Sequence, residues 1–143
     1  ITDQEVLVPQ LLVDMPEGAF NWRVYAFNAT PSVSQWSEVR SLIIDLSPPS
    51  QPELNFPTQS DGVLSDTTLT FVFSSGVDEL SMTYDSLWIA STNTFVNPIR
   101  KIRLESNGTY SDSLGSGTWY WRVKTIDEAG NGALSETASF EIE

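Results

Sequence analysis

The residues best suited to binding a ligand are aromatic side chains that we expect to face solvent. Trp88 lies between Leu87 and Ile89, so it points outward if these two side chains point into a core. An exposed Trp can stack on a sugar ring or contact a neighbouring module, although scattered surface aromatics are also ordinary. Tyr120 is a second aromatic side chain that we expect to face outward. Both are candidate ligand-binding residues.

Arg23 and Trp36 are the second pair of candidate ligand-binding residues. We expect them on neighbouring strands of one sheet, with the guanidinium of Arg23 stacked on the indole ring of Trp36. Such a cation–π contact contributes about 0.5–1 kcal/mol at an exposed site. A contact within the protein is therefore the simpler interpretation, and ligand binding by this pair is the alternative.

A loop with several oxygen-bearing side chains is the candidate metal site. Asp127, Glu128 and Asn131 lie in this loop, and Asp45 or Glu17 could add oxygens from a junction between modules. Calcium takes six or more oxygen ligands, usually from closely spaced acidic residues, which this loop lacks. The alternative is a solvated turn in which Asp127 accepts hydrogen bonds from its own backbone. No cofactor other than calcium is suggested.

Catalysis lacks its most common side chains. The chain has no His and no Cys, so Ser–His and Cys–His triads, His- or Cys-ligated zinc and disulfides are all excluded. Paired carboxylates can hydrolyse glycosides, and the chain has 19 acidic residues. The sequence places none of them in an apolar pocket, the setting that raises the pKa of a catalytic carboxyl group. We therefore expect no enzymatic activity.

The charge balance is strongly acidic, with 19 acidic and 7 basic residues and a net charge of −12. Such a charge disfavours nucleic acid and anionic membranes as partners. No apolar run reaches the roughly 18 residues that a membrane span requires, so we expect no membrane insertion by this segment. The chain begins with Ile1 rather than Met, which we interpret as a cut end.

An internal repeat organises the chain. The segment GAFNWRV at 18–24 matches GTWYWRV at 117–123 at a spacing of 99 residues, and Trp, Arg and Val coincide. The match resumes at a spacing of 98 residues, where the Ser37–Glu38 pair corresponds to Ser135–Glu136. A repeat of about 100 residues has the length of one β-sandwich module.

The hydrophobic pattern is that of β-strands. Residues 119–126 alternate with a period of two, so Trp121 and Val123 share one face while Arg122 and Lys124 share the other. Trp22 is expected to point inward like Trp121, its counterpart. Other predicted strands are 68–73, 87–89, 102–104 and 140–142. One core is expected from Leu69, Phe71, Phe73, Leu87, Ile89, Phe95, Trp119, Trp121, Val123 and Phe140.

A proline-rich segment, DLSPPSQPEL at 45–54, separates the two copies. Prolines fix φ and hold their predecessors extended, so we expect a stiff connection and modules placed end to end. The second module is predicted to span residues 47–143, with room for about seven strands. Residues 1–46 suffice only for the C-terminal half of a first module. Because these residues lack a partner sheet, we expect completion by an upstream segment or a second copy, without which Phe20, Trp22, Val24 and Ile44 would be exposed.

The phrase GTWYWRVKTIDEAGN at 117–131, followed by SE and a closing FEI strand, resembles bacterial fibronectin type III and related immunoglobulin-like repeats. SQWSEV at 34–39 is similar to the last strand of such a repeat. The resemblance covers the whole chain and implies an all-β fold of tandem sandwiches, the first only partial. One departure is that the Tyr usual in the motif is Phe20 in one copy and Trp119 in the other.

The resemblance implies a function outside catalysis. We expect a structural spacer module of a larger secreted or cell-surface protein, one that displays or spaces other domains. Its partners would be neighbouring domains of the same polypeptide. The alternatives are a carbohydrate-binding module that recognises glycans through Trp88 or Tyr120, and an adhesion module stiffened by calcium that contacts a host or cell-surface protein.

Overall fold

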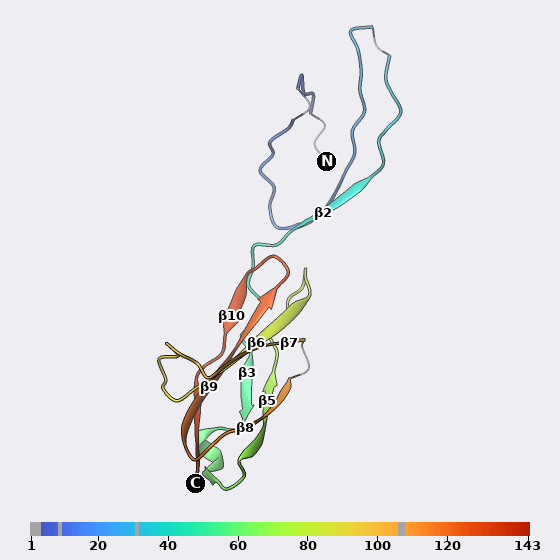
Figure 1. The fold of residues 1–143 in the computed structure, drawn as a ribbon. Helices are drawn as coiled ribbons and strands as arrows, with labels where there is room; N and C mark the ends of the chain where they lie inside the picture. Colours follow the sequence, from blue (N-terminus) through green and yellow to red (C-terminus); the bar gives the residue numbers. More distant parts are fainter. Residues whose placement is uncertain (1–3, 9, 31, 106–107) are drawn as a thin grey trace. The chain divides into compact units, whose positions relative to one another are not determined.

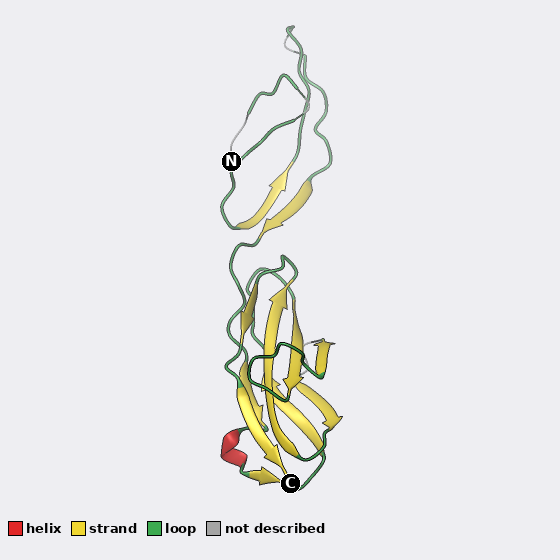
Figure 2. Cartoon of the chain, turned by 60° about the vertical axis from the view of Figure 1, so that its left-hand side comes forward, coloured by secondary structure: helices red, strands yellow, loops and turns green. Residues whose placement is uncertain are grey.

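The structure is a computed structural model that describes residues 4–8, 10–30, 32–105 and 108–143, so Ile1 lies outside the described residues. The chain divides into two compact units, residues 1–45 and 46–143. All regular elements of the described residues are β-strands except one short 3-10 helix, η1 (Gln59–Asp61). The predicted all-β fold is therefore confirmed (Figure 2). No helix in the described part of the chain is long and apolar enough to cross a membrane.

The described residues of the second unit form two β-sheets. The smaller sheet has the strand order β3-β5-β8. The larger sheet has the order β4-β11-β9-β6-β7, and β10 also pairs with β9. The longest strand is β9, which runs along the unit between β6 and β11 (Figure 1). The strands are β3 (Glu53–Phe56), β4 (Val63–Leu64), β5 (Thr68–Ser74), β6 (Thr83–Ala90), β7 (Arg100–Leu104), β8 (Thr109–Ser113), β9 (Gly117–Asp127), β10 (Gly132–Leu134) and β11 (Ala138–Ile142).

The core of the second unit lies between the two sheets and follows the predicted alternation. In β5 and in the C-terminal part of β9, every second side chain is buried. Eight of the ten predicted core residues belong to one buried cluster, and Trp119 packs against it while partly exposed. Leu114 and Ile142 complete the cluster and were not predicted. Phe95 is buried, but it lies outside this cluster, so its predicted place was wrong.

Trp121 lies at the centre of this core and is 0% exposed. Its ring meets that of Phe71, from the opposite sheet, edge to face at a centroid distance of 5.1 Å. Its indole Nε1 donates a hydrogen bond of 2.7 Å to the carbonyl oxygen of Pro57. A buried indole N–H needs such an acceptor, so Trp121 ties the two sheets together through both its apolar and its polar parts.

The first unit is an antiparallel pair, β1 (Gly18–Trp22) and β2 (Arg40–Ile44). None of its described residues is buried. Trp22, for which an inward position was predicted only in a completed module, is 44% exposed. The guanidinium of Arg40 lies 5.7 Å from its ring centroid. The physical reason is that the described residues of this unit form no second sheet over the pair.

The segments just before the last strand of each unit share a hydrogen-bond pattern. In the first unit, Ser37 donates its N–H to the Val24 carbonyl and accepts the Val24 N–H at its hydroxyl, at 2.8 and 3.0 Å. In the second unit, Ser135 and Val123 form the same two bonds at 2.8 and 3.0 Å. These are corresponding positions of the sequence repeat. The repeat therefore reproduces a local geometry as well as residue types.

Candidate binding surface

The outward face of the larger sheet gathers basic and aromatic side chains on three adjacent strands. On the central strand β6, Trp88 is paired in register with Lys101 of β7 and with Arg122 of β9. One step along, Ser86 is paired with Arg103 and Lys124. The alternate residues of these strands point into the core. We call this surface the cationic face; it consists of Tyr84, Ser86, Trp88, Lys101, Arg103, Arg122 and Lys124.

Trp88 faces outward, as predicted, but it is half-buried rather than freely exposed. Its Nε1 donates a 2.8 Å hydrogen bond to the hydroxyl of Ser86. The ammonium of Lys101 lies 4.7 Å from its ring centroid, and the guanidinium of Arg122 lies 4.3 Å from it. Both contacts are within the range of cation–π attraction. Trp88 is thus an aromatic centre held between two cations, and not a bare stacking platform.

The loop between β6 and β7, residues 91–99, crosses in front of this sheet (Figure 2). It brings Phe95 over the outward face, where the Arg122 guanidinium lies 4.1 Å from the Phe95 ring centroid. Phe95 has a φ of 53°, a left-handed conformation that non-glycine residues seldom adopt. The chain therefore turns back sharply after β6. That turn explains why Phe95 buries its ring on Arg122 and Trp88 instead of entering the core.

Arg122 is the most enclosed cation of the cationic face. Its Nε atom is buried and has no hydrogen-bond partner within the described part of the chain. Burial lowers the pKa of the guanidinium from its ordinary value, because desolvation penalises the charged form. Arg122 is still a cation at neutral pH. The rings of Trp88 and Phe95 stabilise its charge, while its Nε–H group donates no hydrogen bond in the described part of the chain.

The remaining cations lie around this centre. The guanidinium of Arg103 stacks 3.6 Å from the ring centroid of Tyr84, and it pairs with exposed Glu105 at 3.3 Å. Lys124 lies close to β10: a Cβ atom at Gly132 would come 2.7 Å from its Cε. Tyr120 lies two residues before Arg122 on β9, opposite Ala90 of β6, and is half-buried.

The other predicted ligand-binding pair lies in the first unit. The guanidinium of Arg23 is 4.1 Å from the ring centroid of Trp36, so the expected cation–π contact is confirmed. The ring of Tyr25 also meets Trp36 edge to face at 4.4 Å. Trp36 was expected on a strand, but β2 begins only at Arg40. The structure therefore keeps Arg23 and Trp36 together and places Trp88 and Tyr120 in the other unit.

The predicted metal-binding loop is a tightly hydrogen-bonded turn. The carboxylate of Asp127, which is 1% exposed, accepts the backbone N–H of Asn131 at 2.8 Å and its side-chain amide at 3.0 Å. Glu128 is exposed in the turn, and Asp45 ends the first unit directly after β2. A carboxylate oxygen of Asp78 lies within 4.8 Å of one of Asp127. Both oxygens of Asp127 thus stabilise the turn, and calcium binding stays a prediction.

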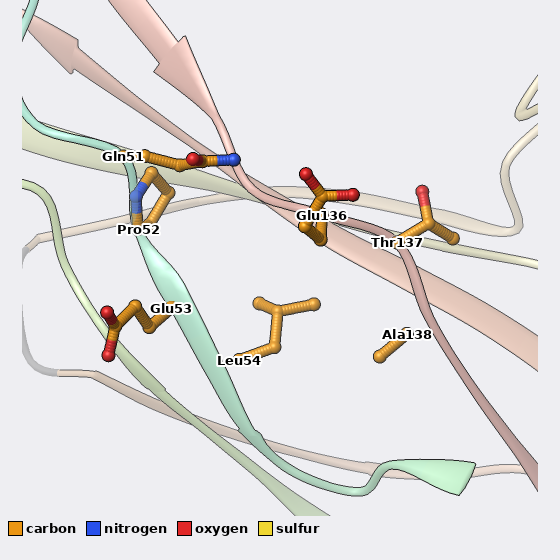
Figure 3. Close-up of a pocket in the computed structure, with 7 residues that line it drawn as sticks. All are labelled: Gln51, Pro52, Glu53, Leu54, Glu136, Thr137 and Ala138. Carbon is orange, nitrogen blue, oxygen red and sulfur yellow. The ribbon is translucent and has the colours of Figure 1, made fainter.

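An open groove of about 410 Å³ lies beside β3 in the second unit. It is lined by Gln51, Pro52, Glu53, Leu54, Glu136, Thr137 and Ala138 (Figure 3). The carboxylates of Glu53 and Glu136 point away from each other (Figure 3). Acid–base hydrolysis of a glycoside requires two carboxyl groups that flank one bond. These two do not have that arrangement.

No protein-family model and no curated protein matches the sequence. Among solved structures, pectate lyase PelI from Erwinia chrysanthemi in complex with tetragalacturonic acid is similar at a TM-score of 0.49 and 16% identity, over 63% of this chain and 28% of that one. The fibronectin(III)-like modules of Clostridium thermocellum CbhA are similar at a TM-score of 0.50 and 15% identity, over 92% of this chain and 64% of that one. The chain therefore spans less than two thirds of either. Its fold is that of fibronectin type III-like modules.

Proposed function

We propose that this chain is a non-catalytic spacer of a larger extracellular protein of bacterial type, in which modules of fibronectin type III-like fold follow one another. The observation that carries the proposal is the reciprocal bonding of Val24 with Ser37 and of Val123 with Ser135. The same two hydrogen bonds at corresponding positions support the view that the chain contains the C-terminal part of one module followed by a second module. The likeness to the CbhA modules covers 92% of this chain, more than the second unit alone contains.

The connection between the copies supports a spacing role. Pro49 and Pro52 are buried in the second unit. Between them, Ser50 donates its N–H to the Val77 carbonyl and accepts the Val77 N–H at its hydroxyl, both at 2.9 Å. These contacts fix the end of the connection on the second unit, and the ring of Pro48 restricts φ just before it. A connection held in this way limits the orientations that one unit can adopt relative to the other.

The placement of the acidic residues supports a non-catalytic role. The buried carboxylates of Asp85 and Asp127 are engaged by hydrogen bonds of the fold itself. A general acid would need a free carboxyl group beside a substrate-sized cleft. We expect the pure chain to hydrolyse neither glycans nor peptides. Hydrolysis that a single carboxylate substitution abolished would contradict this expectation.

A labelling experiment tests the spacing role. The chain has no Cys, so Gln35→Cys and Ser60→Cys can carry one fluorophore pair, one label in each unit. We expect a narrow distribution of single-molecule energy-transfer distances, and a broader one after Pro48→Gly, which frees φ in the connection. The control is Pro16→Gly, which changes a proline away from the connection. A distribution that is already broad before Pro48→Gly would contradict the proposal.

A further inference from the structure

The basic residues of this acidic chain are concentrated on one surface. Of 7 basic residues in the whole sequence, four belong to the cationic face, two on each strand that flanks β6. The second unit has one other cation, Arg100, and Asp112 neutralises it with a contact of 2.6 Å. Because the protein as a whole carries a charge of −12, such a local reversal of sign is not a consequence of composition. It requires an explanation specific to this surface.

Most of these cations have no acidic partner. In the described ranges, no carboxylate forms an ion pair with Lys101, Arg122 or Lys124. Arg103 has only the exposed carboxylate of Glu105, and exposed ion pairs contribute little. The Nε of Arg122 is both buried and unpartnered, a state that costs free energy unless an acceptor reaches it. A ligand with anionic groups could therefore supply the partners that these cations lack within the described part of the chain.

The spacing of the cations follows from the pairing of the strands. Neighbouring strands are about 4.8 Å apart, and side chains on one face recur about every 7 Å along a strand. Lys101 and Arg122 therefore begin about 10 Å apart, and Arg103 and Lys124 form a parallel row about 7 Å away. Trp88 occupies the middle of the first row. The pattern is a grid of positive charges around Trp88, whose ring is half-buried between Lys101 and Arg122.

This pattern suits one class of polyanion better than others. Nucleic acid carries one negative charge per about 1.7 Å of duplex. The acidic remainder of the chain would repel so dense a row of negative charges. An acidic peptide would gain most from pairing with a sheet edge, which only β7 offers on this face, and it would leave Arg122 and Lys124 of the inner strand β9 without an anion. An anionic polysaccharide has separated charges on rings with apolar faces, and such faces pack on aromatic side chains. Its charges and rings correspond to the cations and the aromatic residues of this face.

We propose that the cationic face binds an anionic polysaccharide, whose carboxylate or sulfate groups contact Lys101, Arg103, Arg122 and Lys124 and whose sugar rings lie against the part of Trp88 that stays exposed between its two cations. Arg122 is pre-positioned by Trp88 and Phe95, at 4.3 and 4.1 Å, so little conformational freedom is lost on binding. Lys101 and Lys124 extend from the two flanking strands. This inference goes beyond the spacing role and does not depend on it.

Binding to defined polymers tests the proposal. Affinity electrophoresis and calorimetry would use alginate as the carboxylated probe, dextran sulfate as the sulfated probe and dextran as the neutral one. We expect the chain to bind at least one charged polymer, more weakly as salt increases, and not to bind dextran. Which charged polymer binds more tightly identifies the anionic group. Failure to bind either charged polymer, or equal binding of dextran, would overturn the proposal.

Matched variants separate the face from the overall charge. Lys101→Gln with Lys124→Gln removes two charges from the cationic face, and Arg23→Gln with Arg40→Gln removes two from the first unit. We expect the first pair to weaken binding by about tenfold or more. Hydrogen bonds to a charged group are stronger than neutral ones, and the loss of two such contacts is enough to change the Kd by this factor. The second pair should change it less than about twofold. Equal losses would show a bulk charge effect and overturn the proposal.

Competing polyanions provide the last arm of the test. Poly-L-glutamate and single-stranded DNA carry similar charges without pyranose rings. We expect both to bind at least about tenfold more weakly than the preferred polysaccharide. Tighter binding of poly-L-glutamate would assign the face to an acidic peptide, and tighter binding of DNA would assign it to nucleic acid; either result would contradict the proposal. Native tryptophan fluorescence confirms that each variant is folded.

Discussion

Thr125 donates its hydroxyl to the carboxylate of Asp85 across the β6–β9 pair at 2.6 Å, and both residues are 0% exposed. The second oxygen of Asp85 accepts the hydroxyl of Ser75, also at 2.6 Å. Thr125 in turn accepts the backbone N–H of Gly76 at 3.0 Å. A buried carboxylate is thus held by two hydroxyl groups instead of a cation. Such a network is stable only while each member has its partners.

Thr125→Val should therefore destabilise the second unit strongly. The substitution preserves shape but leaves one oxygen of Asp85 and the N–H of Gly76 without partners, at a cost of about 1–3 kcal/mol for each group. Chemical denaturation measures the change in unfolding free energy. The control is Thr70→Val, which removes an exposed hydroxyl pair with Ser111 at 2.9 Å and should cost less than about 0.5 kcal/mol. Equal effects would show that the buried network is not important.

Trp121→Ala and Trp22→Ala form a second matched test, because the two residues occupy corresponding positions of the repeat. Trp121 is fully buried and should cost about 3–5 kcal/mol of unfolding free energy when truncated. Trp22 is 44% exposed, so its truncation should leave the urea unfolding of the second unit unchanged. A large loss on Trp22→Ala would mean that the stability of the second unit depends on the first.

The sequence could predict what depends on alternation and could not predict what depends on register or loop direction. Period two was sufficient to place Leu87 and Trp121 in the core. The same parity places Asp85 inside as well, since it lies two residues before Leu87, but parity alone does not predict the burial of a carboxylate, which is rare without a partner.

The cationic face needed information that is absent from local patterns. Trp88 could be assigned to the outward face, but its position between Lys101 and Arg122 depends on how three strands align. The burial of Phe95 depends on the path of the loop after β6, which no periodicity describes. For Trp22, an inward position has meaning only where a second sheet covers it.

Asp127→Ala should loosen the turn between β9 and β10. The substitution removes both hydrogen bonds to Asn131, and we expect a loss of about 1–3 kcal/mol. Thermal unfolding in EDTA measures this loss without any contribution from metal. Glu128→Ala, in the exposed part of the same turn, is the control and should change stability by less than about 0.5 kcal/mol. If Asp127→Ala lowered stability only in millimolar calcium, Asp127 would act by binding calcium and not by accepting the hydrogen bonds of Asn131.

Gly76→Ala tests how the second unit holds the connection. A Cβ atom at Gly76 would collide with the carbonyl oxygen of Ser50, which is backbone and cannot rotate away. The collision should displace Ser50 from Val77 and cost about 1–3 kcal/mol, as overpacking does. Calorimetric melting measures the loss of stability. The same variant in the doubly labelled chain should broaden the distribution of energy-transfer distances.

The matched control for this last prediction is Gly115→Ala. A Cβ atom at Gly115 would meet no atom within 4 Å, so the substitution should be neutral or slightly stabilising, since Ala restricts the unfolded chain. If Gly76→Ala lowered stability but left the distance distribution narrow, Ser50 would be important for the sandwich alone. The spacing role would then rest on the prolines. If Gly76→Ala behaved like Gly115→Ala in both measurements, the close packing of the connection on the second unit would be refuted.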